Sequence, residues 1–206
     1  MGRNSLAEER KAQILSAFAR CVARSGFAGT SLESVAEEAK LARGHVRHYL
    51  GNRHDQVVAL CEWVSAAGEE AFTEVRQIAD DGKRAAAVMD YLFNPRFYEP
   101  SEGLAVFLAL FEEARRDETL RAMFLDSYRD ILSTLAGALA GADETLPEKN
   151  ANEIAYLMLC AAVGNAHLSQ TGIGPSRTRR VGTLCRRVLK MLTPAGPVRK
   201  SPTSRA

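Results

Sequence analysis

Apolar residues recur three or four positions apart along almost the whole chain, the spacing that places them on one face of an α-helix. No segment shows the alternation of apolar and polar residues that is typical of a half-buried β-strand. The pattern therefore predicts an all-α fold of about nine helices. The apolar stripes are Ile14, Phe18, Cys21 and Val22; Val57, Leu60, Cys61, Val64, Ala71, Phe72 and Val75; Val88 and Leu92; Leu120, Phe124, Ile131, Leu135 and Leu139; and Val181, Leu184, Cys185, Val188, Leu189 and Leu192.

Capping residues indicate where these helices begin and end. Ser5 with Glu8, and Thr30 with Glu33, have the spacing of capping boxes, in which the two side chains satisfy backbone N–H groups at a helix start. Gly26 suits the left-handed conformation that ends a helix. Further boundaries are predicted at Asn52, between Pro95 and Pro100, between Gly141 and Pro147, and from Gly172 to Pro175.

The apolar run at 104–111 is short enough to be a buried strand. Val106 is its one β-branched residue, however, and the helical pattern continues into the polar residues that follow. We therefore expect a helix that is buried on most of its circumference, at the centre of a bundle and next to a ligand cavity.

Composition and charge limit the function classes. The chain is 46% hydrophobic and 25% charged, as in globular proteins, and has no apolar run of membrane length. Its first residues lack the apolar core of a secretory signal, so we expect a cytoplasmic protein. Residues 1–60 carry nine basic and six acidic side chains, residues 61–175 nine and nineteen, and residues 176–206 nine and none. This asymmetry favours contact between the N-terminal segment and a polyanion.

Two short helices with a tight connection fit into the last twenty of the first fifty residues. Val35, Ala36 and Ala39 form a small apolar face on the first, and Val46 and Leu50 do so on the second. A short helix with cationic and hydrogen-bonding side chains on its other face suits the major groove of DNA, although an ordinary solvated face has the same pattern. The side chains concerned are Arg43, His45, Arg47 and His48.

This segment resembles the TetR family of bacterial transcriptional regulators. The family pattern is an amphipathic helix, a Gly-aromatic-x-x-Thr-Ser/Thr motif, an Ile/Val-Ala pair, a turn and a short recognition helix. The matching segments are 14–24, 26–31 (Gly-Phe-Ala-Gly-Thr-Ser), 35–39 (Val-Ala-Glu-Glu-Ala), 41–50 (Leu-Ala-Arg-Gly-His-Val-Arg-His-Tyr-Leu) and 51–53 (Gly-Asn-Arg).

The resemblance implies a homodimeric regulator that binds a palindromic operator in double-stranded DNA. Repression relieved by a small-molecule effector is the family's usual outcome, and activation is the alternative. We expect a helix-turn-helix DNA-binding domain over residues 1–55, with the helix-turn-helix itself at 31–50. An effector-binding and dimerisation domain is expected over 56–195, followed by a disordered basic tail at 196–206, for which contact with DNA stays open.

The resemblance also assigns roles within the DNA-binding segment. For Tyr49 the alternative is a half-buried packing role, and a metal site at His45 and His48 is not expected because no third ligand has suitable spacing. The predicted DNA-binding residues are Thr30, Tyr49 and Arg53 toward phosphates, Arg43, His45 and His48 toward base edges, Arg47 toward either, and Ala42 at a position where the family often has a phosphate-binding hydroxyl.

Three of the departures from the family pattern leave the operator sequence open. Lys40 stands where the family usually has glycine, so it must adopt a left-handed conformation or change the turn. Ala42 removes a hydroxyl, and Arg47 replaces a common tyrosine. The fold prediction is unaffected by these three changes.

Dimerisation has independent support near the C-terminus. A helix at about 148–170 is rich in small residues, which allow close helix approach, and the last helix carries a continuous apolar stripe with arginines around it. Two such helices from each subunit would form a four-helix interface. Packing within one subunit is the alternative.

The effector site is expected among aromatic and polar side chains of the middle helices, because small-molecule sites are mostly apolar with a few polar groups. The run at 110–117 is similar to the branch of the family that contains choline-responsive betaine regulators, and aromatic walls suit a cation. The predicted effector-binding residues are Trp63, Phe107, Phe111, Tyr128, Tyr156, Asn165 and His167.

Two other function classes are compatible with an all-helical chain. A helical enzyme would need a nucleophile with its base, or a metal cluster, and the sequence contains no motif for either, so we expect no enzyme, cofactor or metal. A helical module that binds a protein partner and not DNA is the remaining alternative.

Overall fold

The structure is a computed structural model that describes residues 3–193, except for the side chains of residues 3–5 and 67. This part of the chain forms nine α-helices, one short 3-10 helix and no strand, which confirms the all-α prediction. None of these helices is long and apolar enough to span a membrane. The predicted tail at 196–206 lies outside the described residues. The elements are α1 (Arg3–Ser25), α2 (Leu32–Ala39), α3 (Arg43–Leu50), α4 (Arg53–Arg76), α5 (Asp81–Leu92), η1 (Pro95–Phe97), α6 (Glu102–Glu113), α7 (Glu118–Ala142), α8 (Glu148–Ser169) and α9 (Pro175–Leu192).

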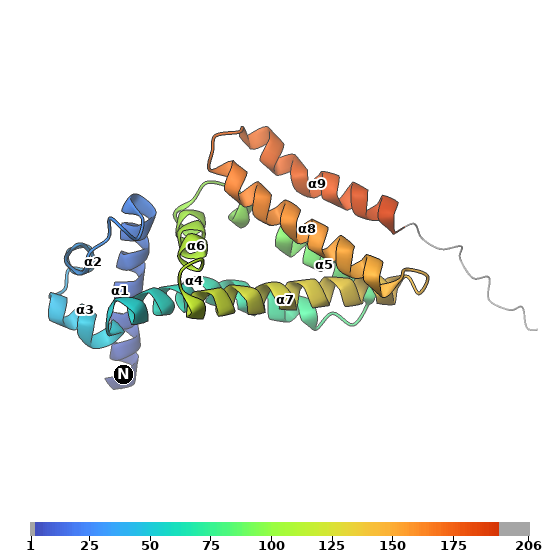
Figure 1. Cartoon of the computed structure of the whole chain (residues 1–206). Helices are drawn as coiled ribbons and strands as arrows, with labels where there is room; N and C mark the ends of the chain where they lie inside the picture. Colours follow the sequence, from blue (N-terminus) through green and yellow to red (C-terminus); the bar gives the residue numbers. More distant parts are fainter. Residues whose placement is uncertain (1–2, 194–206) are drawn as a thin grey trace, which may run out of the picture.

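Helices α1–α3 form a head at one end of the molecule, and α4 leads from this head into the bundle formed by the other helices (Figure 1). In the bundle, α7 lies along α5 and α8, while α6 stands between the bundle and the head. Helices α8 and α9 lie side by side at the outer edge.

The predicted helix boundaries are confirmed, including the breaks between α5 and α6, α7 and α8, and α8 and α9, but the two predicted capping boxes are wrong. Gly26 follows the end of α1 with a φ of 65°, and Asn52 caps α4 by accepting a hydrogen bond from the N–H of Asp55. The capping box predicted at Ser5 is wrong, because α1 already includes Arg3 and Ser5 therefore lies inside the helix.

The cap of α2 also differs from the prediction. The capping box is formed by Ser31 and Ser34, in place of Thr30 and Glu33. Thr30 is not available for capping, because it is buried and its hydroxyl donates to the Gly26 carbonyl at 2.7 Å. The helix therefore begins one residue later than its sequence signature suggests.

The buried side chains form two hydrophobic clusters, which we call the head core and the body core. The head core joins α1–α3 to the first part of α4, to α6 and to the start of α7, whereas the body core joins α5, the later part of α7 and α8 to Phe72 of α4. The segment 104–111 lies in α6 and contains no exposed residue, which confirms the predicted buried helix. Large members of the two cores are Ile14, Phe18, Val46, Leu60, Leu110 and Leu120 in the head, and Val88, Met89, Leu135 and Met158 in the body.

Candidate DNA-binding surface and effector cavity

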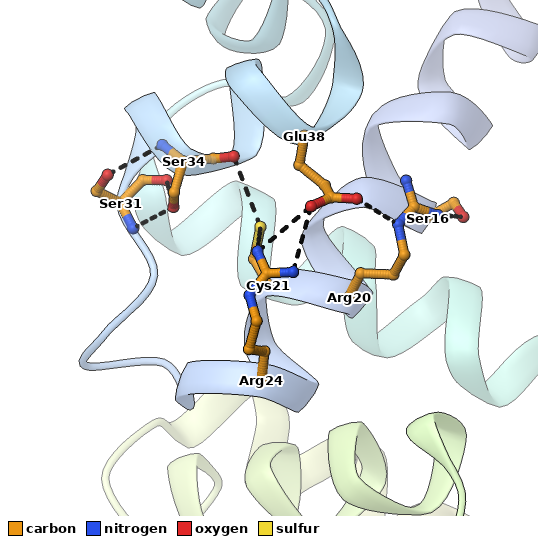
Figure 2. Close-up of polar contacts among 7 residues, drawn as sticks. All are labelled: Ser16, Arg20, Cys21, Arg24, Ser31, Ser34 and Glu38. Carbon is orange, nitrogen blue, oxygen red and sulfur yellow. Dashed lines mark hydrogen bonds and ion pairs between the residues drawn. The ribbon is translucent and has the colours of Figure 1, made fainter.

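Helix α2 is clamped to α1 by polar contacts around Glu38 (Figure 2). Arg20 donates to the Glu38 carboxylate at 2.7 Å, and Arg24 approaches the other carboxylate oxygen at 3.3 Å. The hydrogen bond from Arg20 is the main reason that the pKa of Glu38 lies below its ordinary value, and Arg24 contributes further. A weaker contact joins the Cys21 thiol to the Ser34 carbonyl at 3.6 Å. These contacts fix the helix that precedes the turn.

The turn between α2 and α3 is built around Lys40. This residue adopts the left-handed conformation, with φ 56° and ψ 42°. The turn is therefore kept without glycine, which is the first of the two alternatives expected from the sequence. Two hydrogen bonds close the end of α2, from the Lys40 N–H to the Glu37 carbonyl at 3.0 Å and from the Leu41 N–H to the Ala36 carbonyl at 2.9 Å. This is the pattern of a Schellman cap, and it sets the direction in which the chain enters α3.

Helix α3 is anchored on one side and exposed on the other. Val46 and Leu50 are buried in the head core. Arg43 forms an exposed ion pair with Glu33 of α2 at 2.8 Å, so part of its charge is neutralised in the DNA-free chain. Three more predicted DNA-contacting side chains of this helix, His45, Arg47 and His48, are exposed.

The N-terminus of α3 lacks a side-chain cap. Ala42 occupies the N-cap position and forms no side-chain hydrogen bond there. A hydroxyl at this position would satisfy one backbone N–H, so its absence leaves the first turn of α3 free to donate to an external acceptor. Tyr49 is half-buried against the head core, and its ring lies 5.1 Å from that of His48.

The remaining phosphate candidates are already engaged within the chain. The Arg53 guanidinium donates to the Phe27 carbonyl at 2.8 Å and lies 5.2 Å from the ring centroid of Phe18. The Thr30 hydroxyl is held by its bond to Gly26, as described above. Both residues nevertheless line a polar hollow of about 250 Å³, to which α2, α3 and α4 contribute. Its other lining residues are Ser31, Leu32, Arg47, Gly51, Asn52 and Gln56.

A second cavity, of about 310 Å³, is lined by residues of α4, α5, η1, α6, α7 and α8. It contains two of the predicted effector-binding residues, Phe107 and Tyr128. Aromatic rings of Tyr91, Phe97 and Phe124 line it as well, and sequence reasoning missed these three. Their edge-to-face and tilted contacts form a chain of rings along the cavity wall.

The other five predicted effector-binding residues lie outside the lining. Phe111 packs on the ring of Phe124 behind the wall, and its ring is 5.5 Å from that of His167. Asn165 is buried, and its amide donates to the Thr178 carbonyl at 3.2 Å between α8 and α9. Trp63 and Tyr156 are exposed side chains.

The polar groups of the cavity are few. The Tyr128 hydroxyl is buried and has no hydrogen-bond partner among the described residues. Burial raises the pKa of Tyr128 to about 12, so this hydroxyl is a neutral donor at any physiological pH. The charged side chains in the lining are Glu69 and Arg96.

The head is joined to α7 by a polar contact at the start of α4. His54 lies 2.9 Å from the Asp117 carboxylate, which also caps α7 by accepting from the Leu120 N–H. The backbone bond from Leu120 is the largest cause that lowers the pKa of Asp117, and His54 lowers it further. Asp117 thus caps α7 and also contacts the first turn of α4, next to the head.

Known proteins with similar sequences and folds agree with this arrangement. No family-level sequence model matches the chain. The HTH-type transcriptional regulator BetI of Burkholderia mallei (strain NCTC 10229) is 30% identical over 158 residues, which cover 75% of this chain and 78% of that protein. Similar solved structures include a TetR transcription regulator from Haloarcula marismortui (TM-score 0.73, 14% identity, 90% of this chain and 97% of that one).

Two further structures were determined with ligands. A regulator from Saccharomonospora viridis in complex with choline has a TM-score of 0.73 at 18% identity and covers 89% of this chain and 96% of its own. AibR, in complex with isovaleryl coenzyme A and operator DNA, has a TM-score of 0.68 at 19% identity and covers 91% and 100%. At these identities the structures show a shared fold.

The similarity to a curated regulator, together with the two-helix arrangement of α2 and α3, defines the class of this protein as a helix-turn-helix transcription regulator. The identity to the BetI regulators makes the assignment more specific: the chain belongs to the TetR family of transcriptional regulators.

Proposed function

We propose that this regulator binds a palindromic operator as a homodimer and that a small molecule in the 310 Å³ cavity controls its affinity for DNA. The observation that carries the proposal is the division of α3 into a buried face and a basic, exposed face. A helix held in this way can enter the major groove without unfolding any part of the head.

Dimerisation is proposed through α8 and α9. Along these adjacent helices large apolar side chains remain exposed to solvent in the single chain. An isologous pairing of the two helices with their copies would bury this surface in a four-helix interface. The side chains concerned are Tyr156, Leu157 and Leu168 of α8, and Leu184, Val188 and Met191 of α9.

The roles of the DNA-binding residues follow from their positions. Arg43, His45 and His48 are assigned to base edges, with Arg43 leaving its ion pair with Glu33 when it meets DNA. Thr30, Arg53 and Tyr49 are assigned to the phosphates together with the uncapped start of α3 at Ala42, and Arg47 reaches either target. The two copies of α3 would lie roughly 34 Å apart on one face of the duplex.

Repression relieved by effector binding is the proposed outcome. Helix α4 begins at the head and lines the cavity further along, so a ligand that moves this wall changes the spacing of the two recognition helices. The relatives in complex with choline and with isovaleryl coenzyme A support a ligand in this body without identifying the one that binds here.

The test uses a duplex selected from a random pool by the full-length protein, with binding followed by fluorescence anisotropy. Arg43→Ala is expected to weaken binding roughly tenfold or more, and affinity should fall steeply with salt. Arg129→Ala is the matched control, because Arg129 is likewise an exposed arginine with one ion pair, to Asp126 at 3.0 Å on α7. If the affinity changed neither with salt concentration nor in the Arg43→Ala variant, DNA binding through α3 would be refuted.

A further inference from the structure

The charged residues of the effector cavity indicate the chemical class of its ligand. Arg96 belongs to η1, the short turn that connects α5 with α6. Its backbone is held by the two residues before it, because Pro95 has a fixed φ and the Asn94 side chain accepts a hydrogen bond from the Arg96 N–H at 3.1 Å. The guanidinium therefore projects from a rigid turn and not from a loose loop.

The guanidinium of Arg96 covers two of the cavity's aromatic rings. Its central carbon lies 4.6 Å from the ring centroid of Phe97 and 5.1 Å from that of Tyr91. These distances are those of cation–π contacts. Among the described residues no carboxylate forms an ion pair with Arg96. Its guanidinium also interacts with the Tyr91 hydroxyl and lowers the pKa of that group, and the donors not directed at Tyr91 are available to a ligand.

This arrangement disfavours a cationic ligand. A quaternary ammonium group needs aromatic faces, and the faces of Tyr91 and Phe97 already carry a positive charge that would repel it. A carboxylate, in contrast, can pair with the edge of a guanidinium that is held in place by stacking. The N-terminal end of α6, at Ser101 and Gly103, lines the same cavity and adds a partial positive charge, as Arg96 does.

The rest of the lining suits an apolar body. Phe107, Phe124 and Ile131 line the cavity, and the Tyr128 hydroxyl provides one unpartnered donor. The volume of about 310 Å³ is roughly twice that of an engineered cavity that holds benzene. A ligand of about twelve non-hydrogen atoms would fill it.

The geometry points to a monocarboxylate with an aromatic or branched apolar body as the effector of this cavity, its carboxylate on Arg96. The inference rests on the proposed function, because it assumes that the cavity is the effector site. Glu69 is the one acidic residue in the lining and competes with such a ligand for Arg96. Glu69 and Arg96 both lie close enough to Tyr91 to affect its pKa. Burial is the main cause that raises this pKa, Arg96 lowers it, and Glu69 raises it.

The experiment is calorimetric titration of the full-length protein with three compounds of one shape: 4-phenylbutyrate, its neutral amide and 4-phenylbutylammonium. The carboxylate is expected to bind at least about tenfold more tightly than the other two, a moderate ratio because Arg96 is exposed to solvent. Arg96→Gln should remove this preference and leave the affinity for the amide unchanged. Glu69→Gln should strengthen carboxylate binding and weaken ammonium binding.

Arg129→Gln is the control, because it removes the same charge from α7 outside the cavity and should preserve the preference for the carboxylate. Tight binding of the ammonium compound, equal binding of all three, or binding of none would overturn the inference. So would an Arg96→Gln protein that still binds the amide and still prefers the carboxylate. None of these outcomes affects DNA binding by α3, which is judged separately by the salt dependence and the Arg43→Ala variant.

Discussion

Lys40 allows the structure of the helix-turn-helix turn to be tested with one substitution. It is the one non-glycine residue with positive φ among the described residues. The left-handed conformation brings the Cβ of an L-residue close to the following carbonyl oxygen, a contact that glycine does not make. Lys40→Gly is therefore expected to stabilise the protein, although glycine inside a helix is normally destabilising.

The size of the effect follows from two opposing contributions. The left-handed conformation costs an L-residue roughly 1–2 kcal/mol. Glycine also destabilises the folded state relative to the unfolded chain by about 0.4–1 kcal/mol, because it increases the conformational freedom of the unfolded chain. The side chain of Lys40 is exposed, so its loss removes little packing. The net gain is about 0.8 kcal/mol, which for a chain of this length raises Tm by roughly 2–3 °C.

Calorimetric melting of the two proteins at the same concentration measures this change. Lys40→Ala is the control, because alanine removes the lysine side chain but keeps the Cβ, and it should show no comparable gain. If Lys40→Gly melts at or below the wild-type temperature while Lys40→Ala is neutral, the left-handed cap does not carry the cost assigned to it. A gain of equal size in both variants would instead place the effect in the lysine side chain.

Three further predictions concern the cavity, the head and the contact between them. Tyr128→Phe should stabilise the ligand-free protein by about 1 kcal/mol, because it removes a buried hydroxyl without a partner; a lower Tm would contradict this. Val46→Ala should destabilise by about 1–3 kcal/mol, since Val46 is fully buried where α3 meets the head core; urea unfolding with no loss would show that α3 is not anchored there. Asp117→Asn should melt below wild type near pH 7. The N–H of Leu120 and then His54 hold the pKa of Asp117 below its ordinary value, so its charge stabilises the fold above that value, and this stabilisation is lost as the pH falls through the folded-state pKa. The difference in Tm should therefore shrink below about pH 4, and a constant difference down to pH 3 would contradict the assignment.

The head could be predicted closely because its determinants are local in sequence. The cap at Gly26, the cap at Asn52 and the buried positions Val46 and Leu50 all follow from spacing within one or two turns. The error at Thr30 arose because its side chain is buried and its hydroxyl bonds back to Gly26, neither of which the capping pattern shows.

The cavity could be predicted only in part, because its lining depends on how helices far apart in sequence rotate against one another. Phe107 and Tyr128 lie in it, whereas Trp63 and Tyr156, which have the same aromatic character, face solvent. Arg96 lies in a turn, where no periodic sequence pattern indicates which way a side chain points. Its role depends on stacking that appears only in three dimensions.

The cavity lies where the two hydrophobic cores meet. Along α4, Cys61 belongs to the head core and Phe72 to the body core, and the lining residues Ser65, Gly68 and Glu69 fall between them. Along α7 the lining likewise runs from Phe124 of the head core to Ile131 of the body core.

The head core includes α6 as well as α1–α3, so we infer that these four helices move together. Packed cores shift as units and do not deform continuously, which makes the junction between them the place where relative motion costs least. A ligand at this junction touches both units at once, and its shape therefore sets their relative orientation. On this view the response depends on how a ligand fills the space between the two cores. A substitution in the middle of α4 should then alter DNA affinity without any ligand. Gly68→Ala is such a substitution, because its added Cβ would lie 3.2 Å from the Tyr91 hydroxyl oxygen.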